Sequence, residues 1–228
     1  MGPFITLIAT TYGISEGSVG LVARVLREAG WLTTGARGVN APNMIPLDAA
    51  RLSLALLAGE PSGAIVEEFE FLRTLQARTP YPVTGLTADC GLAADHSLEQ
   101  ALAWLFSLTT ATPSVQVNGT IFHGHWSWPR ISVSVDASAR AAHIQLASQG
   151  TAYEDLAGEQ ELQKLETAPY SDEKLGRLLE LWDRSGTWDS GTVTYGRGMR
   201  VIRTITQDEI SKISDAIAGI DRNPASAT

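Results

Sequence analysis

Apolar residues recur at helical spacing at the start of the chain, where they predict two helices. The first covers residues 2–12 and ends at Gly13; its apolar positions are Phe4, Leu7 and Ile8. Ser15 is a favourable N-cap for the second helix, and Gly30 is a favourable stop. The apolar face of this second helix is expected to contain Val19, Val22, Leu26 and Ala29. A tight, glycine-containing turn is therefore expected between the two helices.

A third helix is predicted to begin at Pro46, a residue that suits the first turn of a helix. Asp48 follows in the same turn, where a negative charge is favourable to the helix dipole. Its buried stripe is expected to consist of Leu47, Ala50, Leu54 and Leu57. Three short helices with a tight turn between the first two are consistent with a helix-turn-helix or winged-helix arrangement. Residues 1–60 are therefore predicted to form a helical module.

Two more helices are predicted before the pattern changes. Residues 63–78 form the fourth, with Ile65, Phe69 and Leu72 directed inward. Ser97 caps the fifth, which extends to residue 108 and has on one side Leu98, Ala101 and Leu105. After residue 113 the chain becomes rich in β-branched residues, and apolar and polar positions partly alternate. Three such segments predict a small antiparallel sheet: 114–122, 129–137 and 142–148.

The remaining part of the chain is mixed in character. Residues 151–173 are acidic and polar, and are expected to be an exposed linker with some helix. Residues 192–206 predict a strand or hairpin, and residues 207–219 predict a helix. The fold class is therefore α+β, with a helix-turn-helix or winged-helix-like N-terminal module. Residues 61–228 are expected to form an α+β domain that contains the small antiparallel sheet and mediates oligomerisation.

The composition is that of a globular chain. The 228 residues are 44% hydrophobic, which suits one large domain or two small ones. The apolar runs are interrupted well short of the roughly 20 residues that a membrane span needs. The first residues lack the basic region and cleavage site of a signal peptide. The single cysteine, Cys90, excludes an intramolecular disulfide and favours a reducing compartment. We expect a cytoplasmic protein with no membrane partner.

Charge is distributed unevenly along the chain. The net charge of −8 argues against a protein that coats polyanions over its whole surface. Residues 1–59, however, contain four arginines and three acidic residues, a balance of +1 that leaves −9 for the rest of the chain. An acidic body with small basic features favours local contact with nucleic acid over broad adhesion.

The segment "TTGARGVNAPN" at residues 33–43 is permissive and rich in hydrogen-bond donors. Gly35 and Gly38 allow close approach of the backbone, and Arg37 offers a bidentate donor that also suits a narrow minor groove. Side chains that can hydrogen-bond phosphates or base edges are those of Thr33, Thr34, Asn40 and Asn43. Loops near a groove-binding helix contact the phosphate backbone in helix-turn-helix proteins. This loop is therefore a predicted DNA contact.

Residues 18–59 resemble the N-terminal DNA-binding segment of helix-turn-helix proteins encoded by phages and prophages of bacteria. The similarity rests on "V-x-x-x-L-R-x-A-G" at residues 22–30, the glycine and arginine loop, and the alanine- and leucine-rich helix that follows. It implies DNA binding through Ser18, Arg24, Arg27, Thr34, Arg37 and Asn40. One position departs from the pattern, because Ile45 precedes Pro46 where Thr or Ser would be a stronger cap.

A second basic segment, residues 190–206, contains three arginines and no acidic residue. On a strand, Arg197 and Arg203 would share one face, and Arg200 would lie on the other. One interpretation pairs these arginines with the acids of residues 153–189 or with Asp208 and Glu209. The other places Arg197 and Arg200 on a β-arm that contacts DNA phosphates, and we include both as candidate DNA-binding residues.

Metal binding and catalysis lack sequence support. His123 and His125 would share a face of a strand, but no acidic residue accompanies them, so a polar or partly buried pair is favoured. Cys90 and His96 lack an assignable oxyanion donor and orienting group, and Cys90 is expected to be a small buried hydrophobe. The chain has no Walker A motif, dinucleotide fingerprint or zinc-finger spacing. We therefore expect no enzyme, no metal and no cofactor.

These features predict a sequence-specific DNA-binding protein of phage or prophage type, which acts as a transcriptional regulator in the bacterial host cytoplasm. Its partners would be double-stranded DNA and further copies of itself. A homodimer is favoured, because one weakly basic module binds a half-site poorly and two linked modules add their contacts. Two alternatives are a small terminase-like DNA-packaging subunit and an α+β interaction protein that does not bind DNA.

Overall fold

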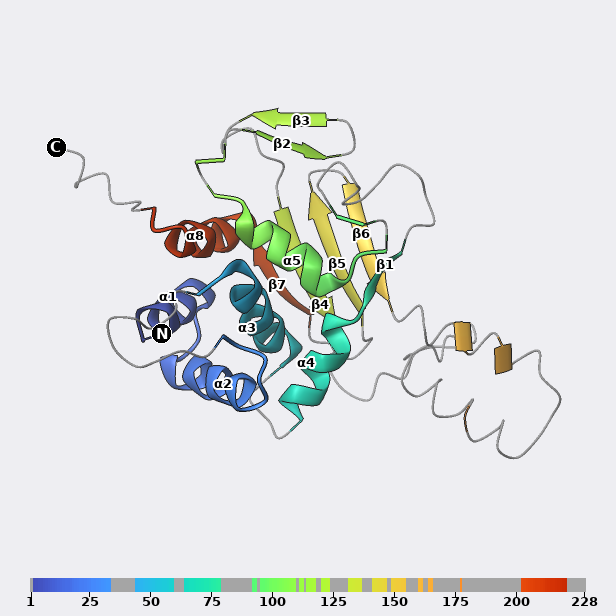
Figure 1. Ribbon diagram of the computed structural model, residues 1–228, viewed down its shortest axis with the longest axis horizontal. Coiled ribbons are helices and arrows are strands. Elements are labelled where there is room, and N and C mark those ends of the chain that lie inside the picture. Colours follow the sequence, from blue (N-terminus) through green and yellow to red (C-terminus); the bar gives the residue numbers. More distant parts are fainter. Residues whose placement is uncertain are drawn as a thin grey trace.

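The computed structural model describes residues 2–33, 44–59, 64–78, 92–93, 95–109, 111–112, 114–117, 120–123, 131–136, 141–146, 149–154, 160–161, 164–165, 177 and 202–220. Within these ranges the chain forms helices and antiparallel sheets, which confirms the α+β class (Figure 1). The helices are α1 (Gly2–Tyr12), α2 (Glu16–Glu28), α3 (Pro46–Ala58), α4 (Ile65–Arg73), α5 (Leu98–Ser107) and α8 (Gln207–Ile217).

The main sheet has five antiparallel strands in the order β1-β6-β5-β4-β7. Its strands are β1 (Gln76–Arg78), β6 (Gln149–Glu154), β5 (Ala141–Leu146), β4 (Ile131–Asp136) and β7 (Ile202–Thr206). A separate hairpin pairs β2 (Ser114–Val117) with β3 (Thr120–His123). The sheet is larger than the sequence predicts, because β1 and β7 join it from segments far away along the chain.

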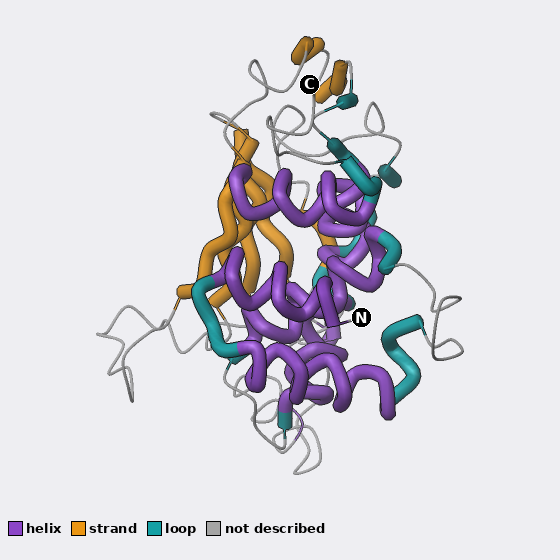
Figure 2. Tube along the Cα trace, turned by 90° about the vertical axis from the view of Figure 1, so that its left-hand side faces the viewer, coloured by secondary structure: helices purple, strands orange, loops and turns teal. Residues whose placement is uncertain are grey.

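The main sheet has one face covered by helices and one polar face. In β4, Ile131, Val133 and Val135 are buried, whereas Ser132 and Ser134 between them are partly exposed. The Ser134 and Thr204 hydroxyls lie 3.0 Å apart on this outer face and form a hydrogen bond. The helices lie on the opposite side (Figure 2). Such an arrangement, with one face packed and one solvated, is common for antiparallel sheets.

Helix α3 lies at the centre of the helical layer. It packs against α4 and α5, and it also contacts α2, α8 and the sheet. One hydrophobic cluster extends from Ile8 in α1 to Ile213 in α8, and it includes residues on both sides of position 60. The division into domains 1–60 and 61–228 stays a prediction, but the described core is continuous across it.

The turn between α1 and α2 is short because two of its residues have special roles. Gly13 has φ +66°, a left-handed conformation that glycine adopts without strain. Ser15 caps α2, since its hydroxyl oxygen accepts the backbone N–H of Ser18 at 3.0 Å. The predicted helix boundaries at Gly13, Ser15 and Gly30 are therefore confirmed, with Gly30 also left-handed at φ +80°.

Three predictions from the sequence are wrong in detail. The fourth helix ends at Arg73, because Gln76–Arg78 pairs with β6 as strand β1. Residues 151–154 belong to β6 instead of an exposed linker, since this segment has strand partners on both sides. Ala29 is exposed, because it is the C-cap of α2 and lies beyond its last helical turn.

Replacement of Gly13 by alanine should lower the free energy of unfolding by about 1 kcal/mol, because an L-residue is strained at positive φ. Gly20 is the matched control: it lies within α2, and a Cβ added there meets no atom within 4 Å. Gly20→Ala should therefore stabilise the protein by about 0.5–1 kcal/mol. Urea unfolding of the two variants measures both changes. Equal changes in the free energy of unfolding would contradict a left-handed Gly13 and a helical Gly20.

Candidate nucleic-acid interface

Helices α1 and α2 pack against each other and leave one face of α2 exposed. Ile8 and Ala9 of α1 are buried with Val19 and Val22 of α2. The opposite side of α2 is exposed at Glu16, Gly17, Leu21, Arg24 and Glu28. This face combines one glycine, an apolar side chain and a cation with an acidic residue at each end of the helix, so it can approach another surface closely near Gly17.

The candidate residues on α2 have different surroundings. The Ser18 hydroxyl lies 2.9 Å from that of Ser15, so it belongs to the capping arrangement. Arg24 is exposed to 64% and makes only a long contact with Glu28, with Nε 3.9 Å from Oε1. Such surface pairs contribute little, and the guanidinium stays accessible to an anion. Arg27 is half-buried and has an interaction of its own. Of these residues, Arg24 is therefore the most accessible cation.

Asp48 connects the two flanks of the predicted DNA-binding loop. Its Oδ1 accepts the backbone N–H of Thr33 at 2.9 Å and the Thr33 hydroxyl at 3.1 Å. Its Oδ2 accepts the backbone N–H of Ile45 at 3.4 Å. Asp48 thus satisfies the backbone N–H of the N-cap residue Ile45, whose own side chain makes no capping hydrogen bond. Thr33, predicted to contact DNA, here donates its hydroxyl to Asp48.

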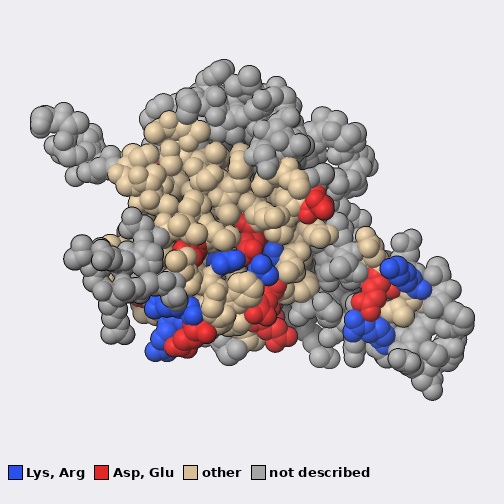
Figure 3. Space-filling view, in the orientation of Figure 1, with Lys and Arg blue, Asp and Glu red and all other residues tan. Residues whose placement is uncertain are grey.

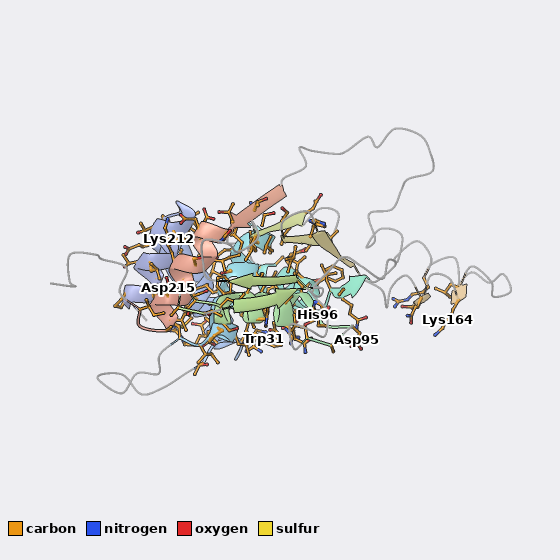
Figure 4. All side chains as sticks on the ribbon, turned by 90° about the horizontal axis from the view of Figure 1, so that it is seen from above. Trp31, Asp95, His96, Lys164, Lys212 and Asp215 are labelled. Atoms are coloured by element: carbon orange, nitrogen blue, oxygen red, sulfur yellow. The ribbon has the colours of Figure 1, made fainter. Side chains whose placement is uncertain are left out.

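Trp31, labelled in Figure 4, precedes the same loop in the sequence and lies at the centre of a cluster of charged and aromatic side chains. The guanidinium carbons of Arg73 and Arg51 lie 4.4 Å and 5.3 Å from the centre of its ring. Arg51 also donates to the Trp31 carbonyl at 2.7 Å, and the indole N–H donates to Glu70 at 3.1 Å. The ring meets Phe69 edge to face at 5.5 Å. These contacts fix the chain immediately ahead of the loop.

Glu99 of α5 neutralises the two arginines of this cluster. Its Oε1 accepts from Arg51 at 2.7 Å and from Arg73 at 3.2 Å, and Oε2 accepts from Arg73 at 3.0 Å. Burial alone would raise the pKa of Glu99, but the hydrogen bonds and charges of Arg73 and Arg51 outweigh it and lower the pKa. Arg51 therefore has a structural role, although its charge counts in the basic balance of residues 1–59.

No sequence motif indicates the Trp31 cluster. Its hydrogen-bonded pairs are 20 to 48 positions apart along the chain and share no motif. A weak indication of a buried ion pair lies in α5, where the acidic Glu99 directly follows the buried Leu98 within an apolar helix. On the face drawn in Figure 3, basic side chains lie beside acidic ones. Mixed charge of this kind favours a small contact area over a broad basic surface.

Several candidate residues lie outside the described part of the chain. Among the predicted DNA-binding residues these are Thr34, Arg37, Asn40, Asn43, Arg197 and Arg200, and among the weighed metal and nucleophile candidates they are Cys90 and His125. Within the described residues, no group of three or more His, Cys, Asp or Glu side chains could hold a metal ion.

The histidine that the sequence placed near Cys90 has a structural environment. His96 is buried, and its Nδ1 lies 2.7 Å from the Ala93 carbonyl oxygen (Figure 4). Burial lowers its pKa, so the neutral ring is favoured. None of the helices in the described residues has the length and apolar character required to cross a bilayer.

Comparisons of the whole chain with protein families, curated proteins and solved structures give no match.

Glu99→Gln should lower the free energy of unfolding by about 2 kcal/mol at neutral pH, because it removes the negative charge with which Arg51 and Arg73, both largely buried, form ion pairs. The pKa of Glu99 is lowered in the folded protein. The stabilisation that the ionised carboxylate contributes is therefore fully present above the ordinary carboxyl pKa, and it is lost as the pH falls through the pKa of Glu99 in the folded protein. The difference from wild type should therefore shrink below about pH 4.

Chemical denaturation of both proteins across this pH range provides the measurement. Glu67→Gln is a matched control on α4, because Glu67 is exposed, and it should change stability by less than about 0.5 kcal/mol. A pH-independent difference between wild type and Glu99→Gln would show that packing, and not charge, accounts for the effect.

Proposed function

We propose that this chain is a sequence-specific DNA-binding protein of phage or prophage type that regulates transcription. The observation that carries the proposal is the α1–turn–α2 unit: two packed helices joined by Gly13, Ile14 and Ser15, with one face of α2 exposed. Such a pair of helices is consistent with a helix-turn-helix, in which the second helix would enter the major groove. Helix α3 is unsuited to that role, because nine of its thirteen residues are buried.

The exposed face of α2 has the chemistry that groove binding requires. Gly17 and Gly20 add no side chain, so the helix can approach the base edges closely. Leu21 is 39% exposed and suits contact with a thymine methyl group. Arg24 can donate to a phosphate or to guanine. This surface supports binding by a few direct contacts, in agreement with the small basic balance of residues 1–59.

The loop at residues 34–43 completes the proposed interface. Asp48 holds its two flanks, and the Trp31 cluster fixes the preceding residues. Ends that are already ordered reduce the entropy lost when a loop engages its ligand. Arg37, Thr34, Asn40 and Asn43 are proposed to contact DNA from this anchored base, and the protein is proposed to act as a homodimer on a two-part site.

A second candidate function is binding of another protein through the same surface. Ile14 and Leu21 are 38% and 39% exposed, and large exposed apolar side chains favour a protein partner as well as DNA. The two functions differ in their salt dependence, because displacement of counterions from phosphates makes DNA binding weaken steeply with salt.

Arg37→Ala should weaken binding to the cognate DNA by about 1–3 kcal/mol if Arg37 contacts a base, or reduce the salt slope by about one if it contacts a phosphate. Fluorescence anisotropy with DNA fragments from the neighbourhood of the gene, at several salt concentrations, measures both. Lys212→Gln is the control, because Lys212 pairs with Asp208 on α8, outside the proposed interface.

Two outcomes would contradict parts of this proposal. Unchanged binding of the double variant Arg37→Ala, Asn40→Ala would remove the loop from the interface. The same affinity for every fragment, together with no effect of Arg24→Gln, would rule out sequence-specific binding through α2.

A further inference from the structure

A cleft of about 540 Å³ lies beneath the turn between α1 and α2. One wall comes from the end of α1, the turn and the start of α2, and it includes Ile14, Ser15 and Ser18. The other comes from the end of α3, from β7 and from the start of α8, and it includes Leu56, Arg203 and Ile205. Volumes of roughly 300–1,000 Å³ are typical of small-molecule sites.

Arg203 lies on the helix-covered face of the sheet. It is paired in register with Val135 of β4, which is fully buried, and Ile205 two residues later is also buried. Residues two apart on a strand, and residues opposite one another on paired strands, share a face. The side chain is half-buried, and no carboxylate among the described residues forms an ion pair with it. A partly desolvated guanidinium of this kind favours an anionic ligand.

The acidic residue of the cleft has another role. Glu209 accepts the backbone N–H of Thr206 at 2.7 Å and also the Thr206 hydroxyl, so its carboxylate caps α8. Tyr12 shares a 2.6 Å hydrogen bond with Ser53, and burial raises its pKa, which keeps the phenol neutral. Neither group therefore provides Arg203 with the paired anion that an arginine in this position favours.

We propose that this cleft binds a small organic carboxylate with an apolar body. Arg203 and the hydroxyls of Ser15 and Ser18 would hold the carboxylate, and the side chains of Ile14, Leu56 and Ile205 would surround the apolar part. A guanidinium binds a carboxylate through two parallel hydrogen bonds. The single cation and the apolar walls fit a carboxylate better than a more highly charged phosphate ester.

The position of the cleft gives the ligand a regulatory effect, which rests on the proposed function. The carboxylate would contact the turn and the first turn of α2 on one side and β7 on the other. Ser18 belongs both to the cleft and to the candidate DNA-binding residues, so the ligand and DNA compete for the same hydroxyl. The ligand is therefore expected to weaken DNA binding, and linkage requires DNA to weaken ligand binding by the same factor.

Phenylacetate and its neutral analogue phenylacetamide are suitable probes, because they differ in the charge that Arg203 recognises. Isothermal titration of the full chain should show saturable binding of phenylacetate in the millimolar range or tighter, and at least tenfold weaker binding of phenylacetamide. Arg203→Gln should lose at least tenfold in affinity for phenylacetate, whereas Arg203→Lys should retain part of it. Lys212→Gln should bind phenylacetate as wild type does, because it lies outside the cleft.

The proposal of a carboxylate site is overturned if phenylacetate does not saturate, if phenylacetamide binds equally well, or if Arg203→Gln retains full affinity while its circular dichroism matches wild type. The regulatory effect is tested separately, by adding phenylacetate to the anisotropy assay with wild type and Arg203→Gln. Phenylacetate should raise the Kd for DNA only with wild type. Binding of phenylacetate by a protein that binds no DNA would support the site and overturn the proposed function.

Discussion

Burial of α3 on every side is the constraint on which the rest of the structure depends. A helix that contacts four other helices and two strands must be apolar around most of its circumference, and Pro46–Ala58 meets this requirement with alanines and leucines. The buried polar side chains of α3 have hydrogen-bond partners: Ser53 bonds to Tyr12 of α1, and Asp48 bonds to Thr33 and Ile45. The helices and strands around α3 take their positions from this central packing.

The helices could be predicted from the sequence because their boundaries depend on local chemistry. Gly13, Ser15 and Ser97 determine turns and caps through contacts with residues at most a few positions away. The sheet was predicted less completely. Strand β1 has only three residues, and it exists because β6, more than seventy positions later, supplies its hydrogen bonds. No local pattern can indicate a partner at that distance.

The candidate site was predictable to a similar extent. Arg24, which the resemblance names as a candidate, lies on the exposed side of α2. Helical spacing could not indicate that Thr33 would bond to Asp48, or that Arg51 and Arg73 would enclose Trp31 and share Glu99. These contacts depend on three helices meeting around one tryptophan. Charge counting along the sequence therefore overstates the cations available to a partner, because it treats paired and unpaired arginines alike.

The structure uses its arginines in two distinct ways. Arg51 and Arg73 form ion pairs with the buried carboxylate of Glu99. Because breaking a buried ion pair is strongly destabilising, these two arginines are not available to a binding partner. Arg24 lies on an exposed helix surface with only a long contact to Glu28, and Arg203 lines a cleft in which no described carboxylate forms an ion pair with it. Both positions adjoin the same α1–turn–α2 unit. An anion bound to Arg203 in the cleft would therefore contact the same unit that presents Arg24 to a partner. The proposed regulation depends on this proximity more than on the total charge of the chain.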